Sequence, residues 1–345
     1  MPISQVPFAG ISNPVGFRNA LINGDFSVAQ RGTSFASGAN NDDAYTLDRW
    51  YILSDDNDVI DVTQETSVVP TNQLTAIALD VETTNKKFGI AQIIEQKNCV
   101  GLIGNTVTLS FQAKVSSTTK LDNVKCAIVA WSGTADSVTS DIISAWGVEG
   151  TNPTLIANAT YENSPANLNV TTSYAKYVVS AAVDTASTKN IIVFIWSDVT
   201  DTTAGDFLYI TDVQLEPGSQ ASGFETLPID VNLARCQRYF QKIDATGGNS
   251  VISVLQVFSD TQAIGTIPTL IELRANPTLS TTGSFNVWTA LTNNGALGTI
   301  ALFSGTKTQQ GIIFTGTSGG TLTAGDAGGL FSAAGSSSIL LSAEL

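Results

Sequence analysis

Histidine is absent from the 345 residues of this sequence, and basic residues are scarce. Without histidine, the chain has no Ser-His-Asp or Cys-His nucleophile system, no imidazole general base and no histidine metal ligand. It carries 16 Lys and Arg residues against 30 Asp and Glu residues, which gives a net charge of −14 at pH 7. Nucleic acids and anionic membrane surfaces select basic faces, so we expect neither as a partner.

Cysteine is also rare, and its spacing does not favour a metal or disulfide framework. Cys99, Cys126 and Cys236 are far apart and form no CxxC pair. We expect buried, reduced thiols. No apolar run approaches the roughly 20 residues that span a bilayer, and the first residues lack the basic and apolar regions of a signal peptide. We therefore expect no membrane insertion.

The sequence is rich in alternating patterns that are typical of strands. In residues 106–115 (TVTLSFQAKV), apolar and polar side chains alternate, which predicts a half-buried strand. Residues 190–196 (NIIVFIW) form a nearly continuous apolar run, which predicts a strand covered on both faces. Polar turn clusters separate many such runs, as in antiparallel sandwiches and jelly rolls. The predicted fold class is therefore all-β.

Composition divides the chain into three parts. Residues 17–230 are the predicted jelly-roll β-sandwich, and residues 231–345, rich in small side chains, are predicted to form a smaller C-terminal β-sandwich. At their junction, Asp230 is expected to cap a short helix within residues 230–242. Residues 1–16 carry three prolines, which exclude a helix or a central strand. We interpret them as an extended arm, either a floppy terminus or a segment that orders on a partner through Ile3, Val6, Phe8 and Ile11.

Carboxylates and aromatic rings are the remaining side chains that suit chemistry or binding. The acidic clusters at residues 41–43 and 55–61 are predicted to be solvated turn residues, with calcium binding as the alternative. A glycosidase would need two carboxylates that face each other across a bond, which proximity in sequence does not supply. Trp131 and Trp196 lie inside apolar strands and are expected in the core. Trp146 borders a loop and is the better candidate for contact with a glycan, with Tyr161 as a weaker one.

Four segments, taken in order, resemble a known family. They are residues 19–35 (NALINGDFSVAQRGTSF) with 45–51 (YTLDRWY), residues 92–95 (QIIE) with 102–114 (LIGNTVTLSFQAK), residues 210–218 (ITDVQLEPG) with 224–225 (FE), and residues 233–240 (LARCQRYF) with the chain end SAEL. As a set they are similar to tail-fibre and virion-surface proteins of tailed bacteriophages. Residues up to 230 also resemble carbohydrate-binding-module jelly rolls, and the C-terminal part resembles the β-sandwich tips that trimerise in such fibres.

The resemblance implies a structural, non-enzymatic virion protein that is homotrimeric, is made in the host cytoplasm and takes part in host attachment. Its implied partners are other phage proteins, reached through the arm, and a host surface glycan. In modules of this shape calcium often lies between the first and last strands, which would make Asp25 and Asp212 its ligands; no other cofactor is expected. Arg49 and Trp50 are expected to pack, in a structural role, against the same sheet as these two aspartates.

Two other functions stay open at this point. A decoration or connector protein of the particle would share the fold and the arm but would bind no receptor. An enzyme that trims host polysaccharide is less favoured, because depolymerases of this kind are usually long β-helices and no β-helix repeat is visible.

Overall fold

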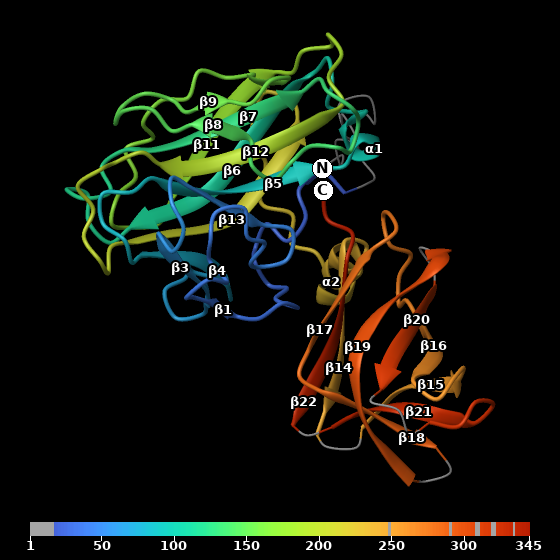
Figure 1. Ribbon diagram of the computed structural model, residues 1–345. Helices are drawn as coiled ribbons and strands as arrows, with labels where there is room; N and C mark the ends of the chain where they lie inside the picture. Colours follow the sequence, from blue (N-terminus) through green and yellow to red (C-terminus); the bar gives the residue numbers. More distant parts are fainter. Residues whose placement is uncertain (1–16, 248–249, 290–291, 308–310, 319–321, 334) are drawn as a thin grey trace, which may run out of the picture.

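The computed structural model describes residues 17–247, 250–289, 292–307, 311–318, 322–333 and 335–345. These residues form mainly antiparallel strands, with a sandwich over residues 34–217 and a second group of strands from residue 240 onward (Figure 1). The predicted all-β class is thereby confirmed. Within the described ranges, no helix is long and apolar enough to cross a bilayer. The predicted arm residues Ile3, Val6, Phe8 and Ile11 lie outside these ranges.

Consecutive strands of the chain often lie in different sheets of the sandwich. One sheet has the spatial order β1 (Ser34–Phe35), β3 (Ile60–Glu65), β4 (Ala76–Val81), β13 (Phe207–Pro217), β6 (Thr106–Val115) and β11 (Ala175–Ala182). The other has the order β10 (Ala159–Tyr161), β7 (Val124–Trp131), β12 (Asn190–Ser197), β5 (Phe88–Ile94) and β2 (Tyr51–Ser54). Because the successive strands β4, β5, β6 and β7 fall in alternate sheets, the chain crosses the sandwich repeatedly, as in a jelly roll.

Burial confirms the strand patterns that the sequence predicts. In β6, alternate side chains from Val107 to Val115 join the core between the two sheets. Every residue of β12 is buried, because Val193 faces this core and its neighbour Phe194 faces a second apolar cluster on the opposite side of the sheet. Trp131 and Trp196 are both buried in that second cluster, as expected.

The outer face of the five-stranded sheet is covered by the chain itself. Residues 138–156, which include β8 (Ile143–Ala145) and β9 (Thr154–Leu155), contribute side chains that pack on this face and complete the second apolar cluster. Within the cluster the rings of Phe194 and Trp196 stack with centroids 4.4 Å apart. A ligand site on this side is therefore built from the covering segment and not from the open face of the sheet.

The strands after residue 240 form a small sheet and a closed barrel, so the predicted C-terminal β-sandwich is wrong. The small sheet has the order β14 (Phe240–Thr246), β22 (Ser336–Ser342) and β17 (Thr278–Thr282). The barrel closes in the order β15 (Val251–Val257), β16 (Gln262–Pro268), β20 (Gly311–Ser318), β19 (Thr292–Lys307), β18 (Phe285–Thr289) and β21 (Ala327–Ser332).

Two local features of these strands favour curvature into a barrel. Register shifts interrupt the ladders of β15, β18 and β19, and each irregularity bends its strand. Gly265 in β16 lies opposite Phe314 in β20, and a Cβ atom at residue 265 would lie 2.6 Å from the Phe314 ring. Glycine therefore lets this buried ring lie directly on the facing strand.

A short helix is present in the predicted region, but Asp230 is not its cap. Helix α2 spans Ile229–Gln237, and its N-cap is Pro228 with no side-chain capping bond, so Asp230 is not the cap. From Phe240 the chain belongs to β14, because Phe240–Thr246 pairs with β22 along its whole length. This long-range pairing overrides the local preference of the sequence.

The three cysteines are buried and unpaired, as predicted. Cys99 ends the short helix α1 (Gln96–Cys99), Cys126 lies in β7 and Cys236 lies in α2. Burial raises the pKa of Cys99 and of Cys126 to about 12. These two side chains therefore remain neutral thiols near neutral pH.

A buried ion pair joins the end of the chain to the sandwich. The Arg49 side chain is 1% exposed and pairs with Glu344, and it also donates a hydrogen bond to the main-chain oxygen of Ile93 in β5. Its guanidinium carbon lies 3.7 Å from the centre of the Tyr239 ring. Arg49 is therefore structural. Its hydrogen bond joins the five-stranded sheet, whereas the expected contact was with the sheet of β13 that holds Asp212.

Further hydrogen bonds support the same junction. Glu344 also pairs with Arg31 at 3.1 Å, and the Tyr45 hydroxyl donates a hydrogen bond to the main-chain oxygen of Leu345. Directly after α2, the Arg238 guanidinium and the Tyr239 hydroxyl both donate hydrogen bonds to the Glu95 carboxylate. The chain end and α2 are thus both fixed on the sandwich.

Replacing Glu344 with Gln should lower the free energy of unfolding by about 3 kcal/mol, because the charge of Arg49 would stay buried without its counter-ion. Urea unfolding followed by tryptophan fluorescence measures this change. Asp201→Asn, which removes an exposed carboxylate paired with Lys120, is the matched control and should change stability by less than about 1 kcal/mol. Equal effects of the two substitutions would contradict the role given to Glu344.

Candidate functional site

An acidic cavity lies beside the segment that covers the five-stranded sheet. Its volume is about 290 Å³, and the end of β2, the turn after it and β8 build most of its wall. The residues that line it are Asp42, Leu53, Ser54, Asp55, Asp56, Asn57, Asp141, Ile143, Ser144, Ala145 and Trp146. We call this cavity the Trp146 pocket.

Trp146, the predicted glycan-binding residue, is fixed by contacts with the buried residues Phe194 and Lys87. Its ring packs edge-on against Phe194, with centroids 5.9 Å apart. The ammonium group of the buried Lys87 donates hydrogen bonds to the main-chain oxygens of Trp146 and Gly147. The tryptophan is held by these contacts, is only partly buried and is one of the residues that line the pocket.

Three aspartates around the pocket are oriented by main-chain N–H groups. Asp42 accepts a hydrogen bond from the N–H of Ser54 at 2.7 Å, and Asp55 accepts one from the N–H of Lys87 at 3.0 Å. Asp141 accepts one from Ile143 at 3.2 Å. Each of these bonds uses one carboxylate oxygen, so the second oxygen can accept a hydrogen bond from a ligand.

Asp42, Asp43 and Asp141 converge next to this pocket. One carboxylate oxygen from each lies within 4.8 Å of the others, and among the described residues this is the one such group of three. Burial, and then the charges of Asp42 and Asp141, raise the pKa of Asp43 to about 6. Such a set of hard oxygen atoms is the kind that binds a divalent cation.

Tyr161, the second glycan candidate, lies outside the Trp146 pocket. It ends β10, its hydroxyl donates a hydrogen bond to the main-chain oxygen of Pro153 at 2.8 Å, and its side chain packs against the second apolar cluster. The structure therefore does not bring Tyr161 and Trp146 into one cavity, and a role of Tyr161 in glycan binding stays a prediction.

The predicted calcium ligands, Asp25 and Asp212, interact with each other. Burial raises the pKa of Asp212, and the nearby charge of Asp25 adds to this effect. Asp212 lies at a bulge inside the last strand of the sandwich, β13, whereas Asp25 lies before β1 and is in no strand. At this bulge Asp212 has a left-handed φ of 56°.

One carboxylate oxygen of Asp212 is available to bind a cation, because only the other oxygen accepts hydrogen bonds. Its Oδ2 atom accepts amide hydrogen bonds from Gln73 at 2.9 Å and Gln112 at 2.6 Å. Its Oδ1 atom is buried and has no hydrogen-bond partner among the described residues. Asp212 Oδ1 and the Asp25 carboxylate are thus the groups that would hold a calcium ion there, and this assignment stays a prediction.

Asp141 is the part of the acidic site that the sequence analysis missed. Residues 41–43 and 55–61 stand out as acidic runs, whereas Asp141 is a single acid about a hundred residues away. Only the folding of the covering segment over the sheet places it beside Asp42 and Asp43. No local signal in the sequence shows this approach.

No protein-family model matches the chain, and no curated protein matches it. Among solved structures, it is similar to the enzymatically active domain of tailspike protein 4 of bacteriophage CBA120, with 17% identity and a TM-score of 0.33. That similarity covers 58% of this chain and spans only 22% of the tailspike chain.

Two carbohydrate-binding modules are similar at the same level. One is TmCBM61, solved with β-1,4-galactotriose, with 14% identity, a TM-score of 0.32 and coverage of 59% of this chain and 100% of that one. The other is the CBM22-1 xylan-binding domain of Paenibacillus barcinonensis Xyn10C, with 11% identity, a TM-score of 0.32 and coverage of 60% and 100%. At such scores, the function of this chain has to be argued from its own residues.

Replacing Asp43 with Asn should stabilise the protein at pH 7 by about 1 kcal/mol. The pKa of Asp43 is about 6 in the folded chain and about 4 when unfolded, so the folded state binds this proton more tightly. The corresponding stability is present below pH 4 and is lost as the pH rises through about 6. Solvent screens the partly exposed carboxylate, which reduces the expected gain. The left-handed φ of 67° at this position suits Asn.

Urea unfolding of the wild type and the variant at several values between pH 4 and pH 7 tests this. The stability of the variant should fall less across this range than that of the wild type. Asp201→Asn again serves as the control. A wild type and a variant with the same pH dependence would contradict the repulsion assigned to Asp43.

Proposed function

We propose that this chain is a virion protein of a tailed bacteriophage that attaches the particle to its host by binding a surface glycan in the Trp146 pocket. The observation that carries the glycan part is the pairing of a fixed, partly exposed tryptophan with several oriented carboxylate oxygens in one cavity. A sugar ring has a C–H face that packs on an aromatic ring and hydroxyl groups that donate hydrogen bonds to carboxylates.

Binding without cleavage is part of the proposal. Hydrolysis of a glycosidic bond needs two carboxyl groups separated by about 5 to 9.5 Å, with the sugar between them. Asp42, Asp43 and Asp141 instead converge, with oxygens within 4.8 Å of one another. This arrangement supports recognition of hydroxyl groups or of a cation rather than attack on a bond from two sides.

Trp146→Ala should weaken binding of the preferred glycan at least about tenfold, because a central aromatic anchor carries a large share of binding energy. The preferred glycan is first found on an array of bacterial surface glycans and then titrated by calorimetry. Trp146→Phe, which keeps an aromatic ring against Phe194, should bind more tightly than Trp146→Ala. The glycan should be recovered at its original length.

Asp201→Asn is the control variant for this experiment, because it removes a carboxylate outside the pocket. Unchanged binding by Trp146→Ala would refute the assignment of the pocket. Shortened glycan chains would refute binding without cleavage. A protein that binds no glycan on the array but joins particles would favour the decoration or connector function instead.

A homotrimer is the second part of the proposal, with a second copy of this chain as the partner of exposed apolar residues in the C-terminal part. Val254 in β15 is 73% exposed, and Phe258, just after this strand, is 71% exposed. Apolar side chains exposed in one place favour self-association, and several linked copies would raise the avidity of weak glycan sites. Residues 1–16 are proposed to join the trimer to other virion proteins.

Val254→Asp should convert the trimer into monomers, because each copy would place a charge in the interface. Light scattering after size exclusion of the full chain measures the mass. Val148→Asp is a matched control, since Val148 is also 72% exposed but lies in the sandwich. A monomeric wild type, or a Val254→Asp variant that remains trimeric, would contradict this interface.

A further inference from the structure

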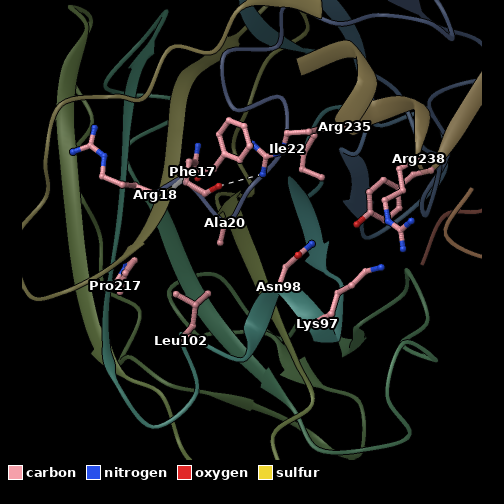
Figure 2. Close-up of a pocket in the computed structure, with 13 residues that line it drawn as sticks. Phe17, Arg18, Ala20, Ile22, Lys97, Asn98, Leu102, Pro217, Arg235 and Arg238 are labelled. Carbon is pink, nitrogen blue, oxygen red and sulfur yellow. Dashed lines mark hydrogen bonds between the residues drawn. The ribbon is translucent and has the colours of Figure 1, made fainter. Parts of the chain in front are cut away.

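A second, basic cavity lies where α2 meets the sandwich and the described chain begins. Its volume is about 470 Å³, within the range of small-molecule sites. Figure 2 shows Lys97 and Asn98 of α1 across the cavity from Arg235 of α2. It shares no lining residue with the Trp146 pocket.

The cavity gathers positive charge in a chain whose net charge is −14. Arg18, Lys97, Arg235 and Arg238 line it, and none of its lining residues is acidic. Glu95 lies nearby but is shared between Lys97 at 3.3 Å and Arg238 at 2.9 Å. The cavity therefore keeps an excess of positive charge.

Two of these cations have no salt bridge with a described residue. Arg18 and Arg235 are absent from the ion pairs of the described chain, and Glu216 and Glu225 act on them only at longer range. The sixteen residues that precede Phe17 contain no Asp or Glu. No side chain of that segment can therefore supply the missing negative charge.

Arg235 is held in a fixed orientation at the cavity wall. Its Nη2 atom donates hydrogen bonds to the main-chain oxygens of Asn19 at 3.2 Å and Leu21 at 3.3 Å. Its guanidinium carbon lies 5.3 Å from the centre of the Phe17 ring. These contacts involve one nitrogen of a planar group with five N–H donors, so donors remain for a planar anion.

We propose that this cavity binds a carboxylate-bearing sugar of the hexuronic acid class. The Arg235 guanidinium and the Lys97 ammonium suit its carboxylate, and the Asn98 amide suits its hydroxyl groups. Phe17 and Leu102 supply apolar surface for the C–H face of the ring. An acidic peptide carries the same charge, but peptides are usually bound along an open groove or a sheet edge. This site is independent of the Trp146 pocket.

Calorimetric titration of the full chain with trigalacturonate, and with the neutral galactose trisaccharide, tests the proposal. Trigalacturonate should bind, the neutral sugar should not, and added NaCl should weaken binding. Lys97→Gln and Arg235→Gln should each weaken binding about tenfold or more. Lys120→Gln, which removes the same charge from an exposed residue outside the cavity, should bind like the wild type. Melting temperatures show whether each variant folds, and the exposed Lys97 is the safer position.

The outcomes separate this site from the Trp146 pocket. Retained trigalacturonate binding by Trp146→Ala would support an independent site, and its loss in that variant would overturn the proposal. Equal binding of the acidic and neutral trisaccharides would also overturn it, as would wild-type binding by Lys97→Gln. Tetraglutamate that binds as tightly as trigalacturonate would assign the cavity to acidic peptides instead.

Discussion

The buried charge of Arg49 is the constraint on which the arrangement of this chain depends. A guanidinium taken out of water is strongly destabilising unless a counter-ion and hydrogen-bond acceptors surround it. Here the counter-ion comes from Glu344, at the far end of the sequence, and the acceptor comes from β5. The last residues of the chain must therefore return to the sandwich, and α2 must place Tyr239 against the same guanidinium. One side chain thus links the first strands, the connecting helix and the chain end.

The same constraint reaches the acidic pocket through a short stretch of chain. Residues 42–49 run from the Asp42 and Asp43 carboxylates to Arg49, and Tyr45 between them binds the main chain of Leu345. Main-chain hydrogen bonds tie this stretch to β2, since Asp43 donates to Ile52 and Ile52 donates to Ala44. The carboxylates are therefore held at a close separation that their mutual repulsion opposes. The contacts of the chain end help to hold that position.

The sequence pattern shows which face of each strand is buried, but it does not show which strands pair with one another. Alternation in residues 106–115 and the apolar run at 190–196 predicted which residues are buried, because burial on one or two faces is a local property of a strand. The barrel could not be predicted in this way, since closure depends on register shifts and on the contact of Gly265 with Phe314. For the same reason the helix was expected anywhere within residues 230–242, although Phe240–Lys242 already begins β14 and pairs with β22. Trp146 was found because it borders a loop, whereas Asp141 and the meeting of Lys97 with Arg235 depend on tertiary folding.

The net charge of this molecule does not describe the local charge of its cavities. A total of −14 repels polyanions, but at physiological salt the field of exposed charges decays over roughly 8 Å. The charges that line the two cavities are therefore of opposite sign locally. Asp42, Asp55 and Asp141 line one cavity, and Lys97 and Arg235 line the other. The first suits the hydroxyl groups of a neutral sugar and the second suits a carboxylate. An acidic surface that limits nonspecific binding to polyanions can therefore coexist with a local site for one acidic group, provided that the ligand enters the cavity.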